Sequence, residues 1–175
     1  MSGAVVWLTG LPSAGKSTLA AALDRRLCAS GRRSCTLDGD EVRKAMVPTP
    51  GYSPEARDAF YATLARLAAL IAGQGLIVLV PATAHREVYR REARRLAPRF
   101  IEVHVDVDAA ECRRRDPKGL YAAASSGDTT GLPGADLAYE RPIAPDVVAR
   151  GGEDEGAVEA VLALLEGQPP RSTNA

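Results

Sequence analysis

The sequence carries no excess of charge of either sign, because 22 lysine and arginine residues balance 22 aspartate and glutamate residues. Proteins that bind nucleic acid or a membrane surface are typically basic, so the balance argues against both kinds of partner. No apolar run approaches the length of a membrane span, and the N-terminus has no basic-then-apolar leader pattern. We therefore expect a cytoplasmic protein that binds small molecules.

Cysteine is also scarce. The three residues, Cys28, Cys35 and Cys112, are odd in number and lack the spacing of metal ligands, which argues against a disulfide framework and a zinc site. With 175 residues, 46% of them hydrophobic, the chain is long enough for one domain with a real core. We expect that domain over residues 1–166 and a disordered tail over residues 167–175.

The strongest motif lies near the start, where residues 10–18 read GLPSAGKST and fit the phosphate-binding loop G-x-x-x-x-G-K-[ST]. Glycine lets the backbone curl so that its N–H groups can surround phosphate oxygens. Lys16 would place its charge on the β- and γ-phosphates, and Ser17 would offer a hydroxyl to Mg²⁺. We assign phosphate binding to Gly10, Ser13, Ala14, Gly15, Lys16, Ser17 and Thr18.

The flanking sequence supports this assignment. A short apolar run over residues 4–9 precedes the motif, and Leu19, Leu23 and Leu27 follow it at the spacing of one helix face. An accidental match in a glycine-rich turn would not need a strand before it and a helix after it. The order of strand, loop and helix therefore indicates a nucleotide site.

The rest of the chain alternates between strand and helix patterns. We expect further strands at residues 33–37, 76–80, 100–105 and 146–148, and helices near residues 41–43, 60–71, 85–98, 109–114 and 158–165. This alternation predicts an α/β fold, a three-layer sandwich in which helices cover both faces of a parallel sheet.

Two segments of this chain have unusual compositions. The helix at residues 85–98 is rich in arginine, and we expect most of these residues to form a solvated face: Arg86, Arg90, Arg91, Arg94 and Arg95. Residues 117–135 are small and polar, a composition that fits a mobile lid.

Two carboxylates, Asp38 and Asp40, follow the strand at residues 33–37, which we expect to lie beside the first strand. In parallel sheets ligands bind at the carboxyl ends of the strands, so these side chains should reach the phosphate loop. Asp38 could instead cap the next helix. We assign Asp40, with Ser17, to Mg²⁺ binding, and Asp40, with Lys16, to catalysis, leaving open whether Asp40 acts as a general base or positions the metal.

The chain resembles the adenylylsulfate kinase family, which uses ATP to phosphorylate the 3′-hydroxyl of adenosine 5′-phosphosulfate. The likeness runs from Val5 to about Leu165. Its most specific pieces are Val6-Trp7-Leu8-Thr9-Gly10-Leu11, Leu37-Asp38-Gly39-Asp40, Arg115-Asp116-Pro117-Lys118-Gly119-Leu120-Tyr121, and Gly134-x-Asp136-x-x-Tyr139-Glu140.

This resemblance implies a P-loop kinase fold, a homodimer, Mg²⁺ and ATP as cofactors, a lid over both nucleotides and a role in sulfate assimilation. It also implies that Arg115 lies near the ATP base and that Lys118 is a lid cation at the acceptor. The acceptor-binding residues would be Asp38, Arg43, Tyr52, Arg57, Phe60, Thr83, His85, Lys118 and Leu132.

The acceptor side departs from the family pattern. Phe60 stands where the family usually has asparagine, and Ala62 and Thr63 replace two arginines. Where the family sandwiches the adenine between two phenylalanines, this chain has Tyr52 and Leu132. A related kinase with another nucleotide-linked anhydride or a small hydroxyl acceptor is therefore an alternative, as is a nucleotide-binding module without turnover.

The family's Ile-Ser-Pro-aromatic-Arg run appears here as Ala82-Thr83-Ala84-His85-Arg86, in a loop that is one residue shorter. His85 could bond an oxygen of the acceptor in this loop. It could equally be a surface residue at the start of a helix.

Overall fold

The computed structural model describes residues 3–127 and 130–167, so the tail predicted at residues 167–175 lies, apart from Gly167, outside the described residues. At its centre is a parallel sheet with the strand order β2-β3-β1-β4-β5. The strands are β1 (Ala4–Thr9), β2 (Ser34–Thr36), β3 (Ile77–Pro81), β4 (Phe100–Val105) and β5 (Val147–Ala149). The helices are α1 (Lys16–Ala29), α2 (Gly39–Ala45), α3 (Pro54–Gly73), α4 (Glu87–Leu96), α5 (Ala109–Arg115), α6 (Leu120–Ser126) and α7 (Glu155–Leu165).

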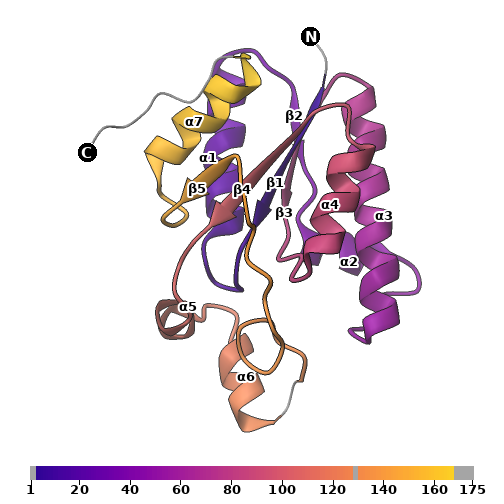
Figure 1. Cartoon of the computed structure of the whole chain (residues 1–175), viewed down its shortest axis with the longest axis vertical. Coiled ribbons are helices and arrows are strands. Elements are labelled where there is room, and N and C mark those ends of the chain that lie inside the picture. The colour runs from indigo at the N-terminus through magenta and orange to yellow at the C-terminus, as the bar shows by residue number, and fades with distance from the viewer. Residues whose placement is uncertain (1–2, 128–129, 168–175) are drawn as a thin grey trace.

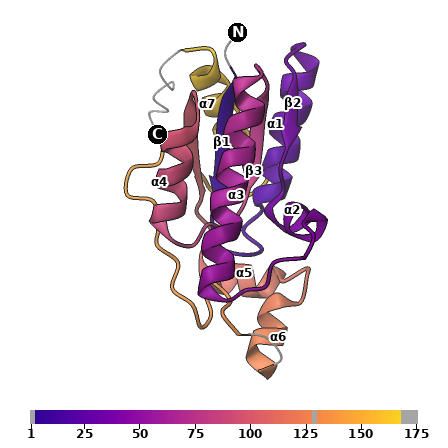
Figure 2. The same ribbon diagram turned by 90° about the vertical axis from the view of Figure 1, so that its right-hand side faces the viewer.

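Helices cover both faces of the sheet, as predicted. On one side α1 and α7 pack on the strands, and on the other side α3 and α4 do so (Figure 1, Figure 2). Successive residues of a strand point to opposite faces, so Val6 joins the apolar cluster under α1, whereas Trp7 joins the one under α3. Because β1 is buried on both faces, its sequence is a continuous apolar run.

The position of β2 was predicted wrongly. It does not neighbour β1 but lies at the edge of the sheet, where Cys35 pairs with Val78 of β3. The strand has only three residues and is partly exposed, with polar Ser34 and Thr36 at its ends. β3 is apolar throughout and fully buried, so it takes the inner place next to β1.

The prediction that most arginines of residues 85–98 form a solvated face is confirmed, and Arg90 is the exception. Arg86, Arg91, Arg94 and Arg95 are exposed, but Arg90 is only 1% exposed. Its Nε donates to Glu102 Oε1 at 2.8 Å, and Glu102 comes from the neighbouring strand β4. A charge is tolerated inside a protein only when it is paired and hydrogen-bonded, and Glu102 supplies that partner.

Several helices begin at a side chain that caps their free N–H groups. Asp38, Ser53, Asp108 and Asp154 each accept a backbone hydrogen bond at the start of α2, α3, α5 and α7. In residues 3–127 and 130–167 we find no helix that is both long and apolar enough to cross a membrane.

The helix α1 should owe its place to the leucines that face the sheet. Leu23 is fully buried, so Leu23→Ala should lower the free energy of unfolding by about 2–5 kcal/mol through lost burial and a residual cavity. Leu70→Ala, at a helix residue that is 63% exposed, is the matched control and should cost less than about 0.5 kcal/mol. Urea unfolding measures both, and equal shifts would contradict the assigned core.

Candidate active site

The strands all run in one direction, so their carboxyl ends lie together at one end of the sheet. The helices α2, α5 and α6 lie at the same end (Figure 1). The phosphate-loop motif connects β1 to α1 at this end. Ser13 and Gly15 both have positive φ, at 65° and 100°, which curls the loop. A Cβ on Gly15 would lie 2.6 Å from Gly152 N, so the loop packs directly on backbone and only glycine fits there.

Lys16 folds back onto this loop. Its Nζ donates to the carbonyl oxygens of Gly10 at 3.0 Å and Leu11 at 2.8 Å. Burial lowers the pKa of Lys16 to about 8, against the opposing effect of the carboxylate of Asp40. The ammonium therefore titrates about one pH unit above neutral, and a phosphate anion beside it would favour its charged form.

The carboxylates after β2 reach the phosphate loop in an arrangement that the sequence did not predict. Ser17 Oγ donates to Asp38 Oδ2 at 2.7 Å, and Asp38 Oδ1 accepts the N–H of Asp40 at 3.0 Å. Asp38 is therefore both the cap of α2 and the neighbour of Ser17. The side-chain oxygen that lies next to Ser17 Oγ at the start of α1 therefore comes from Asp38. Asp40 is bonded to Asp38 through its backbone N–H.

The predicted lid contains α6 and approaches the site at two points. Lys118 Nζ donates to Asp40 Oδ2 at 2.6 Å, which pairs the lid cation with the candidate catalytic carboxylate. Tyr121 is buried, and its hydroxyl donates to the carbonyl oxygen of Pro12 at 3.2 Å. Burial raises the pKa of Tyr121 to about 12, so this hydroxyl keeps its proton.

Arg115, predicted near the ATP base, pairs with Glu111 at 2.7 Å on the last turn of α5. Hydrogen bonds from Arg114 and Arg115 lower the pKa of Glu111 to about 2. No contact in the described residues ties Arg115 to the phosphate loop, so its part in base recognition stays a prediction.

On the acceptor side, the guanidinium of Arg43 lies between two aromatic rings. Its central carbon is 3.8 Å from the ring centre of Phe60 and 4.5 Å from that of Tyr52. Arg43 also donates to the carbonyl oxygen of Gly51 at 2.7 Å. Phe60 is buried, and its ring forms a cation–π contact with Arg43. This contact orients the Arg43 guanidinium, which the sequence assigned to acceptor binding.

Arg57 is also buried and bonded to backbone. Its Nε donates to the carbonyl oxygen of Tyr52 at 2.9 Å, and its Nη2 donates to that of Gly131 at 2.6 Å. The second bond ties α3 to the far end of the predicted lid. Leu132, the next residue, is buried in the apolar cluster that includes Tyr121.

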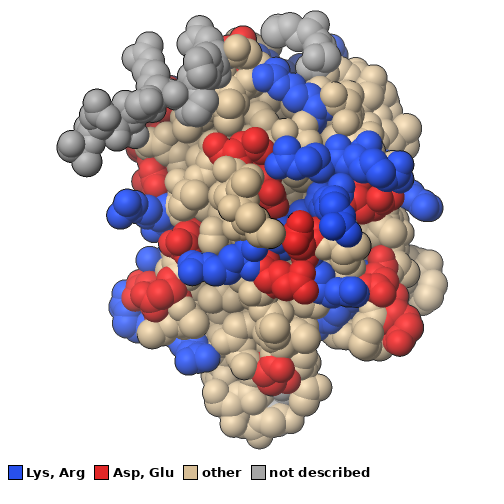
Figure 3. Space-filling view, viewed as in Figure 1, with Lys and Arg blue, Asp and Glu red and all other residues tan. Residues whose placement is uncertain are grey.

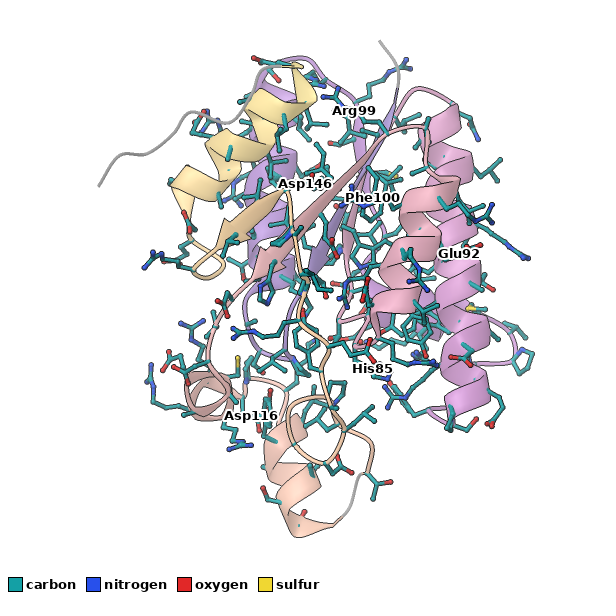
Figure 4. The ribbon with its side chains drawn as sticks, viewed as in Figure 1. His85, Glu92, Arg99, Phe100, Asp116 and Asp146 are labelled. Carbon is teal, nitrogen blue, oxygen red and sulfur yellow. The ribbon has the colours of Figure 1, made fainter. Side chains whose placement is uncertain are left out.

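His85 lies where the chain enters α4 (Figure 4), and it is only 5% exposed. The interpretation as a surface histidine is therefore wrong. Burial, followed by the nearby charges of Arg57 and Arg86, lowers the pKa of His85 to about 4, so its imidazole is neutral. Its Nδ1 is buried and has no hydrogen-bond partner among the residues that the structure describes.

Thr83 is placed by a hydrogen bond that the sequence gave no reason to expect. Thr9 Oγ1 donates to the carbonyl oxygen of Thr83 at 2.6 Å, and Tyr139 Oη lies 3.0 Å from the same Oγ1. Since the Thr9 proton goes to Thr83, Tyr139 donates to Thr9. The only signal for Tyr139 was its place in the Gly134-to-Glu140 motif.

The residues around the phosphate loop fit Mg²⁺ but do not form a closed metal cage. In the described part of the chain, no group of three or more His, Cys, Asp or Glu side chains could hold a metal ion. Mg²⁺ usually binds one or two protein oxygens and completes its shell with water and phosphate oxygens. Ser17 and Asp38 supply such a pair.

Comparisons with known proteins identify the family of this chain. The family model described as adenylylsulphate kinase matches residues 2–150. An adenylyl-sulfate kinase of Vibrio cholerae is 40% identical over 168 residues, covering 93% of this chain and 78% of the relative. One of Pseudomonas aeruginosa is 39% identical over 171 residues, covering 95% and 87%.

A solved structure gives the same answer. The Mycobacterium tuberculosis APS kinase CysC, in complex with AMPPNP and APS, superimposes with a TM-score of 0.87 at 36% identity. The match covers 94% of this chain and 98% of that structure. The fold is therefore a P-loop kinase fold, and the chain belongs to the adenylylsulfate kinase family.

Proposed function

We propose that this protein transfers the γ-phosphoryl group of ATP to the 3′-hydroxyl of adenosine 5′-phosphosulfate. The observation that carries this proposal is the junction of a complete phosphate loop with a cationic acceptor side. Ser17 of the phosphate loop donates to Asp38, the residue that caps α2. The helix α2 itself carries Asp40 and the acceptor-side cation Arg43. The family membership supplies the identity of the two nucleotides.

In this proposal each residue has a separate task. Lys16 stabilises negative charge that develops on the transferred group. Ser17 and Asp38 hold Mg²⁺, which would neutralise charge on the phosphates. Asp40 accepts the proton of the acceptor hydroxyl, so the choice left open from the sequence is made in favour of a general base.

In this proposal the lid residue Lys118 changes partners when the acceptor binds. Lys118 now neutralises Asp40, and it would turn to the anionic acceptor when that ligand enters.

We also propose that the chain acts in the cytoplasm as a homodimer, as the family resemblance implies. The mixture of acidic and basic side chains on the face seen in Figure 3 offers no single-sign patch for a nucleic acid.

A second acceptor is favoured by one observation. Phe60 fills the place of a hydrogen-bonding asparagine and packs under Arg43, so the pocket has lost an amide. A panel of hydroxyl acceptors, assayed with ATP by ADP release above the hydrolysis background, separates the two readings. Adenosine 5′-phosphosulfate should give the highest kcat/KM, and a higher value for another acceptor would replace it.

Lys16→Ala should lower kcat by at least about 10²-fold, because charge stabilisation carries most of phosphoryl transfer. ADP release with saturating nucleotides measures the loss, and circular dichroism checks that the fold is retained. Turnover within about tenfold of wild type would contradict the role of Lys16.

The lowered pKa of Lys16 predicts a pH dependence of nucleotide binding. Phosphates favour the charged ammonium, so bound nucleotide should raise the pKa above its value of about 8 and binding should take up a proton above that pH. The affinity for the ATP analogue AMPPNP should fall about tenfold between pH 7 and pH 9. Calorimetry in two buffers of different ionisation enthalpy measures the proton uptake, and Lys16→Ala should abolish it.

Asp38→Asn and Asp40→Asn should separate metal binding from proton transfer. Asparagine caps helices as well as aspartate does, so Asp38→Asn should retain α2. It should raise the Mg²⁺ concentration for half-maximal activity, with partial recovery at high Mg²⁺. Asp40→Asn should lower kcat by about 10²-fold at every Mg²⁺ concentration. The reverse pattern would make Asp40 the metal ligand.

A further inference from the structure

We propose that Tyr61 and Arg90 are positioning residues for the acceptor, because together they clamp Ala84 in a strained conformation between Thr83 and His85. The inference rests on the proposed function for the identity of the acceptor. Its geometry stands independently, in the loop of residues 82–86 that joins β3 to α4.

Ala84 has a φ of 42°, which residues other than glycine seldom adopt. It is fully buried, and its peptide groups are held on both sides. Its N–H donates to Tyr61 Oη at 3.0 Å, and its carbonyl oxygen accepts from Arg90 Nη1 at 2.6 Å. Such strained residues persist only when their surroundings hold them, and they cluster at functional sites.

The clamp lies in the middle of a loop whose backbone is anchored residue by residue. Ala82 N donates to the carbonyl oxygen of Leu8 at 3.1 Å, and the Thr83 carbonyl accepts from Thr9 at 2.6 Å. The His85 carbonyl accepts the N–H of Glu140 at 2.8 Å. Contacts from β1, α3, α4 and the segment after the lid therefore fix the path of the two residues that flank Ala84.

Within the described residues, the hydrogen bond that the Tyr61 hydroxyl makes is the one to Ala84. The residue is buried, and its ring stacks on that of Tyr89 with centres 4.4 Å apart, which phenylalanine would do equally well. A buried hydroxyl is costly unless it is hydrogen-bonded, and the partner here is Ala84. Burial raises the pKa of Tyr61, so the group stays neutral beside Arg43 and Arg57.

Arg90 closes the clamp from behind. Its three donor positions go to three different segments: Nε to Glu102 on β4, Nη1 to Ala84, and Nη2 to the carbonyl oxygen of Glu140 at 2.8 Å. Because one rigid guanidinium holds both the loop and the segment after the lid, their relative position is fixed. Within residues 3–127 and 130–167 no hydrogen bond or ion pair joins Arg90 to the phosphate loop, so the clamp should affect the acceptor and leave ATP binding unchanged.

The test uses Tyr61→Phe, because removing Arg90 would leave the buried carboxylate of Glu102 with only its longer pair to Arg94, at 3.5 Å. Tyr61→Phe should raise KM for adenosine 5′-phosphosulfate about tenfold, the range expected for one buried N–H left without a partner. The values of kcat and of KM for ATP should stay within about twofold. Tyr89→Phe, which removes a hydroxyl that donates to Asp58, is the matched control and should leave all three constants unchanged.

Ala84→Gly tests whether the clamp is needed because the positive φ of Ala84 is strained. Glycine adopts positive φ without cost, so in the Ala84→Gly background the Tyr61→Phe change should lose most of its effect on KM. If the double variant binds the acceptor as poorly as Tyr61→Phe alone, the inference is wrong. It is equally wrong if Tyr61→Phe lowers the melting temperature and leaves KM unchanged, because the hydroxyl then serves stability alone.

A crystal structure of Tyr61→Phe gives a readout that does not depend on the acceptor. Residue 84 should move to negative φ, and Thr83 and His85 should shift with it. Retention of the positive φ and of the loop would overturn the clamp even if the enzyme were active. Failure of the wild-type protein to phosphorylate adenosine 5′-phosphosulfate would instead overturn the proposed function and leave the crystallographic test standing.

Discussion

The close packing of backbone on backbone at the phosphate loop is the constraint on which the site depends. A side chain at Gly10 would meet the carbonyl oxygen of Val105 at 2.6 Å, and one at Gly15 would meet Gly152. The loop is thereby pressed between the ends of β4 and β5 before any ligand binds. This packing also puts the Lys16 ammonium among loop carbonyls, where lost hydration lowers its pKa. A phosphate thus enters a site whose shape and charge are prepared.

The phosphate loop could be predicted from the sequence because its conformation is encoded locally, by two glycines at fixed spacing. The place of β2 could not, because strand order depends on how α2 and α3 return the chain to the sheet. Arg90 was missed for a related reason: a polar residue on a helix predicts a solvated face unless its partner is known. Here Glu102 lies twelve residues away on another element. The pairing of Ser17 with Asp38, rather than Asp40, depends on the same tertiary geometry.

The acceptor side compensates for its departures from the family pattern with packing. Where asparagine is lost, the ring of Phe60 supports the guanidinium of Arg43 from one side and Tyr52 covers it from the other. Such a stack keeps the guanidinium partly dehydrated, which strengthens its attraction to an anion. Arg57 donates two hydrogen bonds, to the carbonyl oxygens of Tyr52 and Gly131. Both guanidinium groups are therefore held in place by contacts within the chain.

The donor and acceptor sides meet through short polar connections that bypass the hydrophobic core. Thr9, the last residue of β1, carries one hydrogen bond to Thr83 and receives another from Tyr139. The phosphate loop begins at the next residue, so the Thr9 side chain joins the loop of residues 82–86 to the start of the phosphate loop. Since phosphoryl transfer requires the two reacting groups to lie in line, the rigidity of this connection matters more than its energy. A hydroxyl at the end of β1 can make both of these hydrogen bonds, whereas a methyl group could make neither.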